Sequence, residues 1–187
     1  MAVTLFTDLN CPFCYATEQR LEQLGVGDAI AWRGVEHEPE LPVPMALDDV
    51  EIAAELAEEV ASVRARAPEV AIAVPPGKAN TAAGLLATAA ALRVDPVRGA
   101  GFRRAVYRAF WRDGRDVSDP AVLEALARDQ GLPALATRPE DAVTVASWQL
   151  QWQRSPLRGV PLLIRDDGET VYGLKDRETL ARFVRPG

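Results

Sequence analysis

The chain contains two cysteines, Cys11 and Cys14, and only two residues separate them. A disulfide that closes so short a loop removes little entropy from the unfolded chain, so a purely structural cross-link is a poor explanation for the pair. A structural zinc site usually needs about four ligands, and His37 is the only histidine that could join the two thiols. We therefore expect no metal site. The segment Cys11-Pro12-Phe13-Cys14 is typical of a dithiol that exchanges with disulfides.

The residues on both sides of the cysteine pair predict a strand, a helix and a second strand. An apolar, β-prone run at Val3–Thr7 predicts the first strand. A helical pattern follows from Cys11 to about Leu24, where two nearby glycines end it, and Ala29–Val35 predicts the second strand. The dithiol is therefore expected at the start of a helix that follows a strand.

The position at a helix start predicts different roles for the two cysteines. Cys11 lies where free backbone N–H groups and the helix dipole favour an anion, so we expect it to supply the attacking thiolate. Pro12 suits the first helical turn because it has no N–H to leave unpaired. Cys14 follows one turn later on the same side, and we expect it to attack the mixed disulfide held by Cys11 and release the partner.

The rest of the chain is helical in its middle and returns to β-structure at its end. Three prolines between residues 39 and 44 form a linker, and four to six helices are predicted between about residues 46 and 154. A strand over Val160–Arg165, an Asp-Gly turn and a pairing strand over Glu169–Tyr172 follow, and Lys175–Val184 predicts a closing helix. We therefore expect an α/β fold with an inserted all-α subdomain, divided at residues 1–45, 46–147 and 148–187.

Several of these motifs together resemble a known family. The residues concerned are Asp8 to Tyr15, the pair Asn80-Thr81, the aromatic helix end and loop from Phe110 to Asp119, and Gly159-Val160-Pro161. The chain resembles the DsbA branch of the thioredoxin-fold proteins, and within it the cytoplasmic FrnE-like members. The resemblance implies a DsbA-like, thioredoxin-like fold, a redox-active Cys11–Cys14 disulfide and thiol–disulfide oxidoreductase activity. It also implies that Pro161 is a cis-proline facing the dithiol, and that Val160 offers backbone groups to an extended substrate.

Two neighbouring kinds of protein provide alternative functions. The 2-hydroxychromene-2-carboxylate isomerases and kappa-class glutathione transferases share the insertion but carry serine at the position of Cys11. A redox-independent, chaperone-like binding module is the other alternative. DsbA itself usually has histidine where this chain has Phe13, and phenylalanine supplies neither a charge nor a conventional hydrogen bond to Cys11. We therefore expect a dithiol that is less oxidising than that of DsbA.

Four further residues are candidates for the site, each with a simpler explanation. Asp8 could assist proton transfer from Cys14, or it could be a turn residue. His37 lies near the end of the second strand, where it could act at the site or simply be a surface residue. Trp148 and Trp152 lie four residues apart on one predicted helix, where they could pack in the core or line a substrate groove. Lys78 is predicted to be a solvated loop residue.

Charge and hydropathy narrow the set of partners. The 187 residues carry a formal net charge of −6, so a nucleic-acid or membrane-surface partner is not expected, because such proteins usually show basic patches. No apolar run approaches the length of about 20 residues that spans a bilayer. Without a recognisable secretory signal, we expect a cytoplasmic protein, monomeric or homodimeric. Its substrate would be a disulfide-containing protein or a small thiol, with no bound cofactor and with glutathione as a possible co-substrate.

Overall fold

The computed structural model describes residues 2–27 and 30–185 and confirms the predicted start of the chain. Strand β1 (Val3–Thr7) leads into helix α1 (Pro12–Gln23), and strand β2 (Ala31–Gly34) follows. Cys11 is the N-cap of α1 and has extended backbone angles, while Pro12 occupies the first turn. Ala29, the first residue of the predicted second strand, lies outside the described residues.

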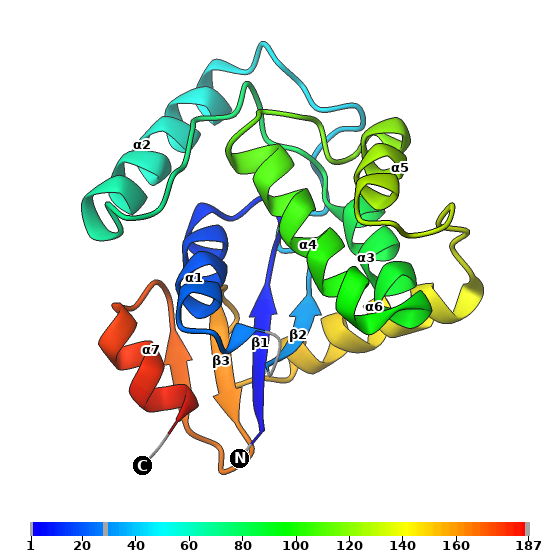
Figure 1. The fold of residues 1–187 in the computed structure, drawn as a ribbon. Helices are drawn as coiled ribbons and strands as arrows, with labels where there is room; N and C mark the ends of the chain where they lie inside the picture. Colours follow the sequence, from blue (N-terminus) through cyan, green and yellow to red (C-terminus); the bar gives the residue numbers. More distant parts are fainter. Residues whose placement is uncertain (1, 28–29, 186–187) are drawn as a thin grey trace.

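The described strands form one mixed sheet in the order β2-β1-β3-β4. β1 pairs in parallel with β2 and antiparallel with β3 (Leu162–Arg165), and β3 pairs antiparallel with β4 (Thr170–Tyr172) (Figure 1). β3 begins two residues later than predicted, because Pro161 has no N–H to donate to a ladder. This order makes β1 an inner strand, so its carboxyl end, where the dithiol follows, lies in the middle of the sheet edge.

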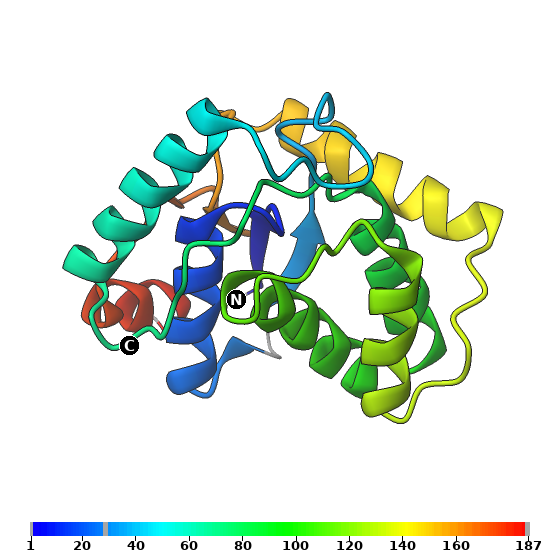
Figure 2. The same ribbon diagram turned by 90° about the horizontal axis from the view of Figure 1, so that it is seen from above.

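Helices cover both faces of the sheet. α1 and α7 (Arg177–Val184) lie on one face, and α6 (Pro139–Gln153) lies on the other (Figure 2). Alternate side chains of β1 follow this division: Leu5 joins the large core beneath α1, and Phe6 joins a small cluster with Trp152 of α6. The sheet thus lies between two helical layers, and α1 begins just beyond the carboxyl end of β1.

The chain between β2 and α6 is helical and forms an inserted all-α part, as predicted. Its helices are α2 (Val50–Arg66), α3 (Ala82–Val94), α4 (Pro96–Trp111) and α5 (Pro120–Asp129). α3 and α4 pack directly against each other, and α4 also contacts α1. The boundary predicted between residues 147 and 148 falls within α6, which packs on both α3 and β2. Among the described residues, no helix combines the length and the apolar character needed to cross a bilayer.

Candidate active site

The two thiols differ in their access to solvent. Both side chains are buried, but Cys11 keeps 6% of its surface exposed and Cys14 keeps none. Cys11 is fixed at the helix start from both sides: its N–H donates to the Asp8 carbonyl over 3.3 Å, and its carbonyl accepts the first helical bond from Tyr15 over 3.1 Å. Only Cys11 therefore presents an edge that a partner in solution can reach.

The surroundings of Cys14 keep its thiol protonated. Burial raises the pKa of Cys14 well above its usual value, and the hydrogen bond and negative charge of Cys11 raise it further. A hydrogen bond from Thr7 and one from the Asp8 backbone act in the opposite direction and are outweighed. A buried thiol with a raised pKa is unreactive toward partners in solution. The site therefore gives the two cysteines different reactivities.

The segment before β3 faces the dithiol, as the family resemblance implies. The Val160–Pro161 peptide bond is cis, which confirms the expectation for Pro161. The Val160 carbonyl oxygen lies 4.0 Å from Cys11 Sγ. Trp152 supports this segment from α6, because its Nε1–H donates to the Gly159 carbonyl over 3.2 Å. Cys11 and Val160 are thus brought together at the site although 149 positions separate them in the sequence.

Asp8 is a fully buried carboxylate with three donors. Its Oδ2 accepts from the backbone N–H of His37 over 2.9 Å and lies 2.7 Å from His37 Nδ1, while its Oδ1 accepts from the Thr81 hydroxyl over 2.7 Å. The structure therefore places both Asp8 and His37 beside the dithiol turn. Thr81 belongs to the Asn80-Thr81 motif of the family resemblance, and no local pattern in the sequence indicates its contact with Asp8.

A lysine continues this polar network away from the dithiol. Lys78 Nζ lies 2.7 Å from a Glu38 carboxylate oxygen and 3.2 Å from one of Glu55. The prediction that Lys78 is a solvated loop residue is wrong, since only 3% of it is exposed. Burial lowers its pKa, but the two carboxylates outweigh burial and raise it overall. Lys78 is buried because two acidic residues from other segments neutralise it.

Aromatic side chains of α4 hold the turn that carries the dithiol. Trp111 Nε1–H donates to the Leu9 carbonyl over 2.9 Å, and the Tyr107 hydroxyl donates to the Asp8 carbonyl over 3.2 Å. Tyr107 also forms a hydrogen bond with Thr7, at the end of β1. The bond from Trp111 satisfies the Leu9 carbonyl, and the bond from Tyr107 adds a second donor to the Asp8 carbonyl, which also accepts from Cys11. The inserted helices thus position the turn that leads into Cys11.

The remaining predicted residues have packing roles. Phe13 is half-buried, and the Arg66 guanidinium lies 5.8 Å from its ring centroid. Trp148 packs edge-on against Trp32 with ring centroids 5.5 Å apart, and Trp152 belongs to the small cluster beneath α6. Trp148 is partly buried against the large core and Trp152 is buried, so both pack, and Trp152 also donates its hydrogen bond to Gly159. Within the described ranges, no group of three or more His, Cys, Asp or Glu side chains is placed to hold a metal ion.

Comparison with known proteins covers nearly the whole chain. A family model described as the DSBA-like thioredoxin domain matches residues 2–185. No curated protein sequence matches the chain. Among solved structures, a probable DsbA oxidoreductase from Streptomyces coelicolor is 23% identical with a TM-score of 0.73, and the match covers 98% of this chain and 88% of that one.

Two further structures show how varied proteins with this fold are. The cytosolic disulfide reductase DsbM from Pseudomonas aeruginosa is 16% identical with a TM-score of 0.72, covering 100% of this chain and 93% of that one. A 2-hydroxychromene-2-carboxylate isomerase is 18% identical with a TM-score of 0.68, covering 98% of this chain and 92% of that one. At these identities the structural likeness establishes the fold, and the chemistry has to be argued from the site.

Proposed function

The chain belongs to the family of DSBA-like thioredoxin domains, and from this premise we propose that it catalyses thiol–disulfide exchange with Cys11 attacking and Cys14 resolving. The observation that carries the proposal is the difference between the two thiols. Cys11 stands at the helix N-cap with an exposed edge, whereas Cys14 is wholly buried and its pKa is raised by burial. This difference supports a fixed order of attack.

The proposed reaction has two balanced exchange steps. The Cys11 thiolate attacks one sulfur of a substrate disulfide, forming a mixed disulfide and releasing the first substrate thiolate. Cys14 then loses its proton and attacks Cys11 Sγ, forming the Cys11–Cys14 disulfide and releasing the second substrate thiolate. The substrate gains two electrons and the dithiol loses two. A second dithiol, or two molecules of glutathione, would return the enzyme to its reduced form by the reverse steps.

The segment before β3 is proposed to bind the substrate chain. Val160 lies against Cys11 through its carbonyl oxygen, and its bond to Pro161 is cis. An extended peptide could bind beside this segment through backbone hydrogen bonds and so bring its disulfide to Cys11. Such bonds depend little on the amino-acid sequence of the peptide. The proposed substrates are therefore disulfides of proteins or of small thiols, with glutathione as co-substrate. We propose no bound cofactor and no nucleic-acid or membrane partner.

We propose a cytoplasmic location and a place among the FrnE-like members of the family, as a monomer or homodimer. The location is supported by the likeness to DsbM, a cytosolic disulfide reductase. The branch is supported by the Asp8 to Tyr15 motif, whose aspartate and cysteines lie in the site and whose tyrosine packs beside Tyr107 and Trp111. In that motif Tyr15 is buried, and its hydroxyl donates to the Ala71 carbonyl over 3.0 Å.

The glutathione-dependent isomerase is the alternative enzyme class. One similar structure is that of a 2-hydroxychromene-2-carboxylate isomerase, but at 18% identity the likeness concerns the fold. A chain that uses Cys11 only to bind or activate glutathione would not need Cys14 as a resolving thiol. A redox-independent binding module would need neither thiol. Disulfide exchange activity that requires both Cys11 and Cys14 therefore separates the proposed function from both alternatives.

The proposed function predicts a reversible two-electron couple. Protein equilibrated in buffers of reduced and oxidised glutathione, then quenched with a maleimide and weighed by mass spectrometry, should convert both thiols together. The reduction potential should lie below the value of about −120 mV for DsbA, because Phe13 supplies no charge between the cysteines. The Cys14→Ser variant, the matched control, should show no such couple. Persistent glutathione adducts on the wild-type protein without an internal disulfide, or a potential at or above that of DsbA, would contradict the proposal.

A further inference from the structure

His37 is held between two carboxylates at the dithiol turn. Its Nδ1 lies 2.7 Å from Asp8 Oδ2, and its Nε2 lies 3.1 Å from Glu38 Oε1. Its backbone N–H also donates to Asp8 over 2.9 Å, so the residue is anchored at two points on the same carboxylate. The imidazole is 29% exposed, and Asp8 is fully buried. Two carboxylates on the two ring nitrogens require both nitrogens to carry a proton.

The segment that carries His37 is fixed from the opposite side as well. The Glu36 backbone N–H donates to the Gln149 side-chain carbonyl over 3.0 Å, and the Gln149 amide donates back to the Glu36 carbonyl over 2.9 Å. α6 thus holds Glu36 while Asp8 holds His37. This arrangement fixes the ring beside the turn that positions Cys11, whose N–H is bonded to the carbonyl of the same Asp8.

The ring is cationic at neutral pH. Burial lowers the pKa of His37, but the hydrogen bonds with Asp8 and Glu38 and the charge of Asp8 outweigh burial and raise the pKa to about 10. The negative charge of Cys11 raises it as well. An interaction between two charges acts equally on both partners, so a cation that is stabilised by the Cys11 thiolate also stabilises that thiolate.

We propose that His37 is a positioning residue that supplies the fixed positive charge of the dithiol site, stabilising the Cys11 thiolate from the end of β2 in place of the charge that Phe13 cannot provide between the cysteines. That this charge serves thiol–disulfide exchange rests on the proposed function. The charge is partly offset by Asp8 and Glu38, which agrees with a dithiol less oxidising than that of DsbA. Without His37, the buried Asp8 carboxylate would lose a hydrogen-bond donor. The electrostatic potential at Cys11 would then become more negative.

Other charged groups face His37 from each neighbouring segment. Asp8 follows β1, Glu36 and Glu38 flank the histidine, and Lys78 approaches through Glu38. Glu55 and Glu59 of α2 complete the set, and the charge of His37 lowers the pKa of Glu59 against a larger increase from burial. Carboxylates outnumber cations in this group of described residues, so removal of His37, the cation that contacts Asp8, is expected to have a clear effect on Cys11.

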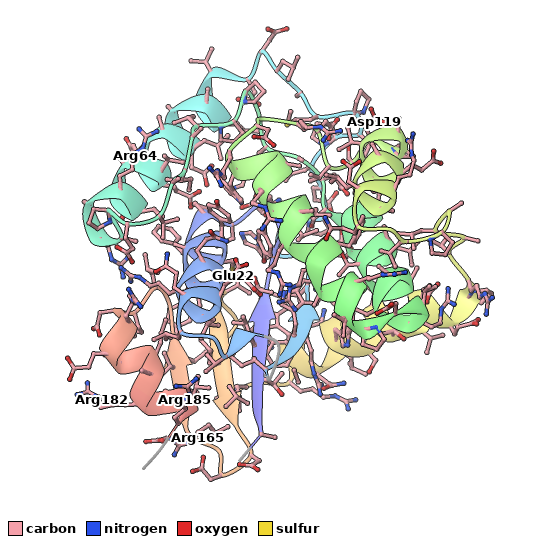
Figure 3. The ribbon with its side chains drawn as sticks, viewed as in Figure 1. Glu22, Arg64, Asp119, Arg165, Arg182 and Arg185 are labelled. Atoms are coloured by element: carbon pink, nitrogen blue, oxygen red, sulfur yellow. The ribbon has the colours of Figure 1, made fainter. Side chains whose placement is uncertain are left out.

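The test measures the reactivity of Cys11 alone, in a Cys14→Ser background. The rate of alkylation by iodoacetamide is followed from pH 5 to pH 10 for the parent and for His37→Gln, His37→Arg and Arg182→Gln. Gln keeps a neutral donor toward Asp8, Arg keeps the charge, and Arg182 lies on α7 at the far edge of the molecule from the start of α1 (Figure 3). This last variant is the matched control for loss of one positive charge.

His37→Gln should move the pH of half-maximal alkylation upward by about one unit, since a nearby opposite charge shifts a titration by about one to three units. At pH 7 its rate should fall by up to about tenfold. His37→Arg and Arg182→Gln should keep the parent profile. A purely structural role for His37 would not move the pH profile and would not be rescued by arginine.

Each other outcome also decides the proposal. A His37→Gln profile that coincides with the parent's would overturn it, even where the Cys11–Cys14 couple exists. If His37→Gln unfolds, His37→Asn takes its place as the neutral variant: an upward shift that His37→Arg does not show supports the proposal, and a parent profile contradicts it. The assay needs no turnover, so it gives an answer even where glutathione equilibration shows no redox couple and the proposed function fails.

Discussion

Replacement of Cys11 by serine is expected to reduce insulin reduction to the rate of the reducing agent alone, a loss of several orders of magnitude. A serine hydroxyl does not ionise near neutral pH and cannot attack a disulfide, and Cys14 cannot take its place because none of its surface is exposed. The rate is measured by the turbidity of the released insulin chain with dithiothreitol as electron donor. Activity close to the wild-type value would remove Cys11 from the mechanism.

The matched control is Cys14→Ser, the same chemical change three residues further along α1. It should also lose steady-state turnover, because the mixed disulfide on Cys11 has no internal thiol to resolve it. It should, however, still consume one equivalent of a disulfide reagent, whereas Cys11→Ser should consume none in the same time. Both variants should keep the wild-type circular dichroism spectrum, since each change replaces one atom.

The second large effect concerns Trp111, which connects the inserted helices to the dithiol turn. Trp111→Ala is expected to lower the free energy of unfolding by about 3–5 kcal/mol. The side chain is fully buried, packs edge-on against Phe110 at 4.8 Å and stacks near Tyr15 at 6.5 Å between ring centroids. Its loss leaves a cavity and deprives the Leu9 carbonyl of its donor. Urea denaturation measures the effect.

Two further variants on α4 separate the effect of the cavity from the effect of the lost hydrogen bond. Trp111→Phe keeps much of the ring but no donor, so it should cost less than Trp111→Ala while still leaving the Leu9 carbonyl without its partner. Val97→Ala changes a side chain that is 80% exposed on α4 and should alter stability by no more than about 0.5 kcal/mol. A Trp111→Ala variant as stable as Val97→Ala would show that this contact does not hold the turn.

The sequence predicted the helices well because their starts are encoded locally. Asp95-Pro96 and Asp119-Pro120 each combine a capping side chain with a proline in the first turn, and in the structure each aspartate accepts hydrogen bonds from the first turn of α4 or α5. The position of Cys11 followed from the same kind of local signal. The order of the strands could not be predicted in this way, because β1 pairs with β3 across about 160 residues.

The polar part of the site shows where sequence reasoning fails. Asp8, His37 and Thr81 were each visible as residues, but their contacts join positions 29 and 73 residues apart. Each alone has an ordinary explanation as a turn, surface or loop residue. Lys78 was misjudged because a lysine is usually solvated, and its burial depends on carboxylates contributed by two other segments. Such a network becomes visible only once the fold brings its members together.

The central claim is that Cys11 attacks and Cys14 resolves. The most direct test is the mass of the Cys14→Ser protein after reaction with a disulfide-bonded peptide, followed by proteolysis to locate the attached half-peptide. We expect a stable mixed disulfide on Cys11, which wild-type protein should release by forming the Cys11–Cys14 bond. Absence of an adduct on Cys14→Ser, together with an adduct on Cys14 in the Cys11→Ser variant, would reverse the assigned roles and contradict the account.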